Sequence, residues 1–370
     1  MGLQEEINAK VKEISTDGYP MSIGELMNLY RDGELEIHPE FQRIFRWKEV
    51  QKTKFIESIL LGIPIPAIFV SQRSDGVWDV VDGLQRLSTI FEFVGILKDE
   101  EGNKIPPSRL VGTKFLPSLN NKMWNNVDNE EDSFTNEQRI KFKREKLDVK
   151  IIKDSNYKEA KYELFQRINT GGAKLTDQEV RNCLLIMIDK NFYDWLEVLR
   201  SNVHFKNCIP LSEKQYIEQY DMEIVVRFIV YRHINLQNIN GNEDMGEFIT
   251  ETIVYLIENK QIDLEREKEI FERTFEVLDT LLGEDTFKKY DLLSDKFKGA
   301  FSLSIFEVLI SGISKKIESN GNLGRNSEEI KEIIKGISDL PAFKASATGT
   351  RKPRPIIRFK ELRMLGESLF

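Results

Sequence analysis

The chain has few of the residues that most metal and nucleophile chemistry requires. Among its 370 residues are only two cysteines, Cys183 and Cys208, and three histidines, at positions 38, 204 and 233. Two cysteines exclude a disulfide scaffold, and the histidines lack the HxxxH or CxxC spacing of a zinc site. We therefore expect a reducing, cytoplasmic location and assign no metal ligand, although carboxylates are able to hold Mg²⁺.

Long apolar runs and the common catalytic loops are also missing. No stretch approaches about 18 consecutive apolar residues, so no membrane span is predicted. Neither a GxSxG elbow nor a GxxxxGK[ST] loop is present, so nothing indicates a common serine hydrolase or a P-loop ATPase. The composition is that of a globular protein, with 40% hydrophobic and 31% charged residues and a net charge of −8. This acidity argues against coating of nucleic acid over the whole surface, but it allows a local basic patch.

The first part of the chain mixes helical and strand patterns. We predict helices over residues 22–31, 47–61 and 84–97, where apolar residues recur near a period of 3.6. Short apolar runs predict strands over 67–70, 77–81 and 147–152, the first two joined as a hairpin through a Ser-Asp-Gly turn. Five carboxylates without a basic residue at 128–137 predict a solvated loop.

From about residue 156 the pattern is almost wholly helical. Thr176 and Ser212 begin capping boxes, the second opening a helix that we expect to run to about Ile234. Further helices are predicted near residues 246–259, 264–283, 297–317, 327–338 and 356–367. The sequence thus predicts an α+β protein with an α/β domain at residues 1–155 and an all-helical domain at 156–370.

The sharpest local motif is Asp82-Gly83-Leu84-Gln85-Arg86, where a predicted strand meets a predicted helix. A glycine here lets the backbone turn tightly, and the free N–H groups of the helix start favour phosphate. Arg86 is able to add a forked, permanently charged donor, and in the first turn we expect it to face solvent or a pocket. Asp82 holds Mg²⁺, orients a water molecule or simply caps the helix, and the cap is at least as good an explanation.

Two other segments combine arginine with turn or aromatic residues. In PEFQRIFRW, residues 39–47, the aromatic residues are predicted as core anchors and Arg43 as an anion-binding side chain. In FQRINTGG, residues 165–172, Arg167 and Asn169 either point toward the first domain, or Asn169 caps the end of a helix.

Together these segments resemble a known family. The order PEFQRIFRW, SILLGIPIPAIFV with VVDGLQR, and LFQRINTGGAKLTDQEVRN resembles the ParB/sulfiredoxin-like domain of GmrSD-type modification-dependent restriction systems, over roughly residues 22–190. The family's usual Asp-Gly-Gln-Gln-Arg has Leu84 in its third place here. The resemblance implies a domain that binds and often hydrolyses a nucleotide in bacterial anti-phage defence. The matching residues that would line its pocket are Gln42, Arg43, Asp82, Gly83, Gln85, Arg86, Arg167 and Asn169.

The resemblance stops before the nuclease that often accompanies this domain. Relatives that cut DNA commonly carry a C-terminal His-Asn-His nuclease, whereas residues 190–370 hold only His204 and His233, without that arrangement. We therefore expect no cleavage of DNA by this route. A nuclease or another defence protein acting in trans is the expected partner, and the oligomeric state is left open.

The C-terminal segment is strongly basic. Residues 351–363 hold six basic residues against Glu361, a net +5 on a chain of net −8. One interpretation is phosphate contact with DNA. A second, equally supported, is a packed helix whose arginines extend past buried apolar residues, and a third has Arg351 or Arg354 close over the nucleotide pocket. The candidate DNA-contacting residues are Arg351, Lys352, Arg354 and Arg358.

The sequence as a whole predicts a nucleotide-binding and NTP-hydrolysing defence protein of the restriction type. Hydrolysis would be electrostatic, with Mg²⁺ and arginines such as Arg86 neutralising the developing phosphate charge while Asp82 or Gln42 positions the water. The alternative is a non-enzymatic, ParB-like module that binds DNA or a partner under nucleotide control, and a third is an adaptor with a vestigial pocket.

Overall fold

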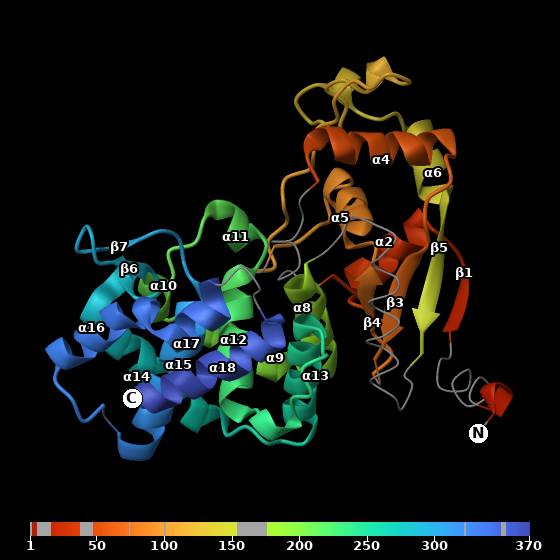
Figure 1. The fold of residues 1–370 in the computed structure, drawn as a ribbon. Helices are drawn as coiled ribbons and strands as arrows, with labels where there is room; N and C mark the ends of the chain where they lie inside the picture. The colour runs from red at the N-terminus through yellow and green to blue at the C-terminus, as the bar shows by residue number, and fades with distance from the viewer. Residues whose placement is uncertain are drawn as a thin grey trace. The chain divides into compact units, whose positions relative to one another are not determined.

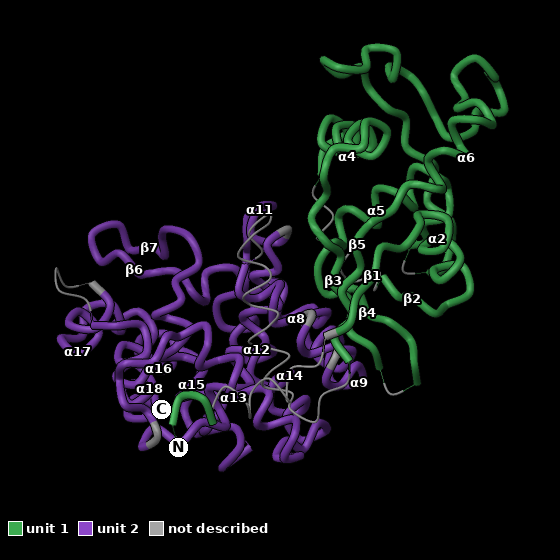
Figure 2. Tube along the Cα trace, turned by 90° about the vertical axis from the view of Figure 1, so that its right-hand side faces the viewer, with its two compact units in different colours: residues 1–175 green, residues 176–370 purple. Residues whose placement is uncertain are grey.

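The chain divides into two compact units, residues 1–175 (unit 1) and residues 176–370 (unit 2), drawn in different colours in Figure 2. The computed structural model describes residues 2–5, 16–37, 47–73, 75–99, 101–153, 176–321, 323–348 and 353–370. The predicted boundary after residue 155 lies outside the described residues and stays a prediction.

Unit 1 is built on a five-stranded mixed sheet in the order β1-β5-β3-β4-β2. β5 pairs antiparallel with β1 and parallel with β3, and β4 pairs antiparallel with β3 and parallel with β2. The predicted hairpin of β3 and β4 is confirmed, with a register shift between Phe69 and Val70. The strands are β1 (Thr16–Ser22), β2 (Leu35–Glu36), β3 (Ile68–Gln72), β4 (Trp78–Asp82) and β5 (Lys146–Ile152).

The first two helices of unit 1 begin and end close to the residues that the sequence marks, whereas the third ends at Phe93 rather than at residue 97 and the fourth was not predicted. Ser22 caps the first helix by accepting a hydrogen bond from the Glu25 N–H, and Gly33 and Gly62 close two helices at positive φ. A Lys52–Glu92 ion pair of 2.6 Å joins the second and third helices. The helices are α2 (Ile23–Asp32), α4 (Glu49–Leu61), α5 (Leu84–Phe93) and α6 (Asn136–Arg144), all visible in Figure 1.

The long connection between α5 and α6 has little regular structure but contributes to the core. Leu110, Leu119 and Phe134 are buried, and the Phe134 ring lies 5.1 Å from that of Phe93. The buried Glu57 carboxylate of α4 accepts the Leu116 N–H at 3.1 Å, which fixes the connection to the helix. The prediction of a solvated loop at 128–137 holds for its carboxylates, four of them exposed, and is wrong for Phe134.

Unit 2 is helical, as predicted, and its core surrounds α12, most of whose side chains are buried. The capping boxes at Thr176 and Ser212 are confirmed. The predicted continuous helix from Ser212 to Ile234 is wrong, because Gln219 adopts a left-handed conformation with φ of 58° and separates α11 from α12. The helices are α8 (Asp177–Ile188), α9 (Lys190–Arg200), α10 (Val203–Cys208), α11 (Glu213–Ile217), α12 (Tyr220–His233), α13 (Met245–Glu258), α14 (Leu264–Leu282), α15 (Leu303–Asn320), α16 (Ser327–Gly336), α17 (Pro341–Phe343) and α18 (Pro355–Leu369).

A small hairpin of β6 (Lys289–Asp291) and β7 (Lys296–Lys298) interrupts the helices of unit 2. The sequence analysis missed it and began a helix at residue 297, where α15 starts only at Leu303. Within the described ranges, no helix combines the length and apolarity that crossing a bilayer requires.

Candidate functional site

The turn between β4 and α5 has the geometry that the Asp-Gly motif predicts. Gly83 lies at φ 104° and serves as the N-cap of α5. The positive φ favours glycine, and a Cβ at this position would also lie 2.4 Å from Ile68 Cδ1 and displace that terminal methyl group. Because the N-cap has no side chain, no side-chain group caps the first turn of α5. The first amides of the helix, at its positive end, therefore remain the natural anion donors of this turn.

Arg86 departs from its predicted role. Only 9% of the residue is exposed, which contradicts the expectation that its side chain faces solvent or a pocket. Its Nη1 donates to the Pro66 carbonyl and, at 3.2 Å, to that of Ala67, while Nη2 donates to Asp82 Oδ2 at 2.7 Å. Burial lowers the pKa of the guanidinium, and the Asp82 carboxylate opposes that change. Arg86 thus ties the approach to β3 and the end of β4 to the first turn of α5.

Asp82 is held by the same contact. Its carboxylate pairs with Arg86 four residues further along, and its side chain is 28% exposed. No cap hydrogen bond to the start of α5 involves Asp82, so the capping explanation is wrong. One carboxylate oxygen is occupied by the guanidinium, and the partly exposed side chain leaves the group accessible to water.

Gln85 connects this turn to the PEFQRIFRW segment. Its Oε1 accepts the backbone N–H of Trp47 at 3.4 Å. The Trp47 ring lies edge-on to Phe55 at 5.4 Å, in agreement with the prediction of an aromatic core anchor. Two of the three predicted segments therefore meet in unit 1. Gln42 and Arg43, which precede Trp47 in the chain, lie outside the described residues.

The third segment, with Arg167 and Asn169, also lies outside the described residues, but the helix that follows it does not. α8 carries buried polar side chains that the sequence analysis did not single out. Arg181, 1% exposed, donates from Nε to Thr250 Oγ1 at 3.0 Å and from Nη2 to the Gly246 carbonyl at 3.2 Å. The available signal was a mostly polar first half of the helix, up to Asn182, that runs directly into a wholly apolar second half. These contacts fasten α8 to α13 inside unit 2.

Metal-binding geometry is absent from the parts of the chain that the structure covers. No group of three or more His, Cys, Asp or Glu side chains that could hold a metal ion occurs among the described residues.

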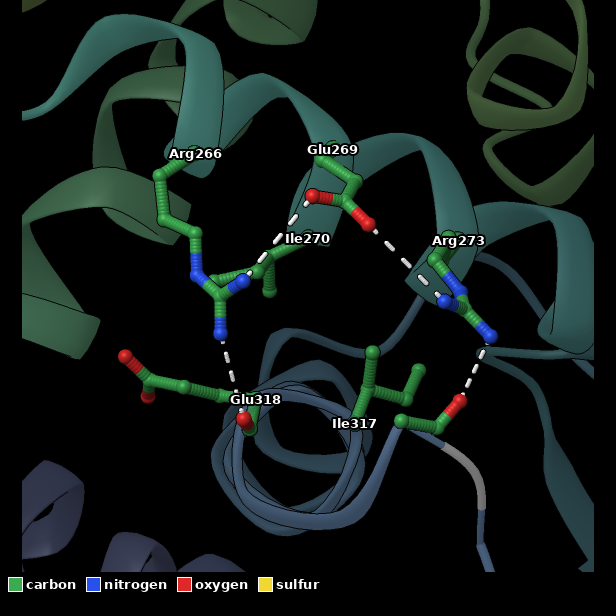
Figure 3. Close-up of a pocket in the computed structure, with 7 residues that line it drawn as sticks. Arg266, Glu269, Ile270, Arg273, Ile317 and Glu318 are labelled. Carbon is green, nitrogen blue, oxygen red and sulfur yellow. Dashed lines mark hydrogen bonds and ion pairs between the residues drawn. The ribbon is translucent and has the colours of Figure 1, made fainter.

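Unit 2 contains a pocket of about 250 Å³ between α14 and the end of α15, shown in Figure 3. Arg266 donates to the Glu318 carbonyl at 3.3 Å and Arg273 to the Gly321 carbonyl at 2.5 Å. Glu269 lies between them, 3.9 and 3.8 Å from the two guanidiniums. The arginines cap the end of α15, and the neighbouring carboxylates balance their charge, so this pocket has no net preference for an anion.

The basic C-terminal segment packs as a helix in its described part. Ile356, Phe359 and Leu362 are fully buried, as the packed-helix interpretation predicts. Arg358 pairs with the Glu307 carboxylate of α15 at 3.2 Å, and Arg354 donates to the Asn242 carbonyl at 3.2 Å. DNA contact by this segment stays a prediction, and its other two candidate residues, Arg351 and Lys352, lie outside the described residues.

Comparison with known proteins identifies the first part of the chain. Residues 23–186 match the family model described as GmrSD restriction endonuclease, N-terminal domain. The match extends past the end of unit 1 and includes most of α8. No curated protein and no solved structure matches the chain. Residues 23–186 therefore form an N-terminal domain of the GmrSD restriction endonuclease type, which belongs to a restriction and phage-defence family.

Proposed function

We propose that the Gly83 turn binds the phosphates of a nucleoside triphosphate, and that this binding serves a restriction-type defence function. The main support is the start of α5, where a glycine at φ 104° leaves the first helical turn without a side-chain cap. Backbone N–H groups and the positive end of a helix dipole together favour phosphate at such a position. A second support is the contact between Gln85 and Trp47, because Trp47 is the last residue of the segment that contains Gln42 and Arg43.

In this proposal Arg86 and Arg43 have different roles. Arg86 is a positioning residue, because its guanidinium already contacts two backbone carbonyls and Asp82. Arg43 is the arginine that contacts phosphate, and Gln42, Arg167 and Asn169 complete the pocket. The proposal therefore assigns the phosphate contact to Arg43 and not to Arg86, the arginine of the Asp-Gly motif.

Hydrolysis of the nucleotide would use the carboxylate oxygen of Asp82 that does not contact Arg86. With one oxygen paired to Arg86, its other oxygen orients a water molecule toward the terminal phosphate, or contacts a Mg²⁺ ion that the nucleotide brings. The ion and Arg43 would neutralise charge that develops on the phosphate. The Arg86 pair also favours the second candidate function, a ParB-like module that binds nucleotide without turnover, because it already engages one oxygen of the Asp82 carboxylate.

The binding proposal is tested by calorimetric titration of ATP, GTP, CTP and UTP into the full chain, alongside melting curves. We expect Arg43→Ala to weaken binding of the preferred nucleotide by about ten- to a hundredfold, as loss of a charge-assisted contact worth ~1.5–3 kcal/mol implies. Its melting temperature should remain unchanged. Arg31→Ala, at an exposed arginine on α2, is the matched control and should alter neither quantity. Equal affinity of Arg43→Ala and the unaltered chain would overturn the proposal.

Release of inorganic phosphate separates the two candidate functions. Asp82→Asn keeps the size of the side chain and a hydrogen-bond acceptor for Arg86. If the site hydrolyses nucleotide, this variant should bind it but release phosphate at least a hundredfold more slowly. Binding without phosphate release in the unaltered chain, with and without DNA, would instead support the nucleotide-gated module.

A further inference from the structure

The β6–β7 hairpin presents two leucines to solvent at its tip. Leu292 is 66% exposed and Leu293 is 100% exposed, although apolar residues of this size are usually found inside. In Figure 1 the loop that joins β6 and β7 extends away from the helices of unit 2. Two adjacent exposed leucines at a projecting tip indicate an interaction surface rather than a packing defect.

The tip is held in shape by its own residues. The Asp291 carboxylate accepts the Leu293 N–H at 3.2 Å and the Ser294 hydroxyl at 2.7 Å, and it pairs with Lys298 at 2.8 Å. Asp295 accepts a hydrogen bond from the Tyr290 hydroxyl. Both carboxylates near the leucines therefore have partners within the hairpin, and Lys298 offsets the charge of Asp291.

The outward face of the strands is basic. Lys289, Lys296 and Lys298 are exposed, and cross-strand pairing sets Lys289 opposite Lys298 and Lys296 opposite Asp291. The opposite face is apolar, with the Tyr290 and Phe297 rings 5.1 Å apart and Lys335 of α16 over Tyr290 at 5.5 Å. Residues 284–298 hold four lysines and four acidic residues, and Lys288 pairs with Glu284 and Asp285, so the positive charge of the hairpin is confined to the outward face of its strands.

We propose that this hairpin is a DNA-binding element, in which Lys289 and Lys296 contact phosphates and Leu293 inserts between base pairs from the minor groove. Two-stranded ribbons enter DNA grooves, and an apolar side chain at the tip of such an element acts as a wedge that unstacks a base step. A wedge needs only one or two apolar side chains, which is what the tip supplies. The inference concerns unit 2 and does not rest on the nucleotide site.

Other partners fit the hairpin less well. A stable protein interface buries about 800 Å² on each partner, far more than two leucines supply. Attachment to a lipid surface also grows with the apolar area inserted, which is small here. DNA is the partner for which a narrow apolar tip and flanking lysines are sufficient.

The test measures binding of the full chain to a 20-base-pair duplex that carries 2-aminopurine, by anisotropy at several salt concentrations and by the fluorescence of the unstacked base. We expect Leu292→Ser with Leu293→Ser to weaken binding about tenfold and to abolish the fluorescence increase without changing the salt dependence. Lys289→Gln with Lys296→Gln should weaken binding several-fold and reduce the slope against log salt by up to about two, roughly one for each lost phosphate contact.

Matched controls lie on the same unit. Val203→Ser replaces another exposed apolar residue, 60% exposed, and Lys206→Gln with Lys214→Gln removes two other exposed lysines. DNA binding that is absent, or that responds to the hairpin and control variants alike, would overturn the proposal. Binding to anionic vesicles or self-association in sedimentation velocity that depends on the two leucines, without a DNA effect, would overturn it in favour of a lipid or a second copy.

Discussion

Each unit holds an arginine against a carboxylate, but the two arginines have different surroundings. In unit 1, Arg86 contacts two backbone carbonyls and the Asp82 carboxylate, whose side chain is 28% exposed. In unit 2, Arg358 pairs with Glu307, whose side chain is not exposed at all. The first arginine positions a turn at the edge of the domain, and the second neutralises a charge in its core. An arginine in a basic or glycine-rich motif therefore does not by itself indicate a ligand contact.

The difference extends to the surroundings of each carboxylate. Glu307 also accepts a hydrogen bond from the Tyr231 hydroxyl at 3.3 Å, and Arg227 donates to that hydroxyl at 2.6 Å. Burial raises the pKa of Glu307, and the charges of Arg358 and Arg227 oppose that change. Asp82 has one cation beside it and is partly exposed to water. Removal of Asp82 or Arg86 in unit 1 should therefore lower the free energy of unfolding less than removal of Glu307 or Arg358 in unit 2.

The largest expected effect is the loss of Glu307. Glu307→Ala leaves Arg358 without its buried counter-charge and Tyr231 without its acceptor, while Arg227 keeps its pair with Glu223. Breaking a buried pair in this way costs about 3–5 kcal/mol. We expect hydrogen exchange to accelerate in α12, α15 and α18 but not in the sheet of unit 1. Glu367→Ala, which removes a partly exposed carboxylate that pairs with Lys315 and Arg363, is the control and should cost less. Similar losses for the two variants would contradict this account of the core.

The second effect is a pH dependence that arises from a buried carboxylate of unit 2. Burial alone would raise the pKa of Glu267, but contacts with His233 and Arg232 outweigh it and lower the pKa to about 2. A carboxylate whose pKa is depressed on folding stabilises the protein above its unfolded pKa and loses that effect as pH falls. Stability should therefore decline between about pH 4.5 and pH 2, by up to ~3 kcal/mol. Glu267→Gln should flatten the decline in urea titrations over this range, and an unaltered pH profile would contradict the assignment.

The third effect tests Arg86 as a positioning residue. Arg86→Ala leaves two carbonyls and a carboxylate without their donor, at a cost of about 2–3 kcal/mol. Melting should fall and exchange should accelerate in β3, β4 and α5. Arg86→Lys keeps the charge but not the fork, so we expect it to recover part of the stability. Lost nucleotide affinity at an unchanged melting temperature would instead return Arg86 to the phosphate site.

The smallest effect should be equal in the two units. Thr135 of unit 1 and Thr176 of unit 2 each form a capping box at the start of a helix. Replacement of either threonine by alanine should cost about 1 kcal/mol, because an N-cap contributes locally wherever the helix lies. Denaturant midpoints of the two variants measure this directly. A much larger loss at Thr176 would mean that its cap also secures the contact of its hydroxyl with the Glu218 carbonyl.

Several strands were not predicted because their sequences lack the residues and the alternating pattern that are typical of strands. β1 contains Gly18 and Pro20, which are poor strand formers, but it is an edge strand and pairs along one side only. A Cβ at Gly18 would lie 2.7 Å from the Val149 carbonyl, so the pairing with β5 requires the glycine. The β6–β7 hairpin is too short for an alternating pattern to be recognised.

The sequence alone determined the features that depend on neighbours three or four residues away. The caps at Thr176 and Ser212, the hairpin of β3 and β4, and the change from a mixed to a helical architecture follow from local hydrogen bonds and apolar periodicity. Tertiary structure decided which groups meet across long separations. Arg86 contacts Pro66 twenty residues earlier, and Arg358 contacts Glu307 fifty-one residues earlier. The partner of a long, charged side chain is set by packing, because its own sequence neighbourhood offers several partners of equal chemistry.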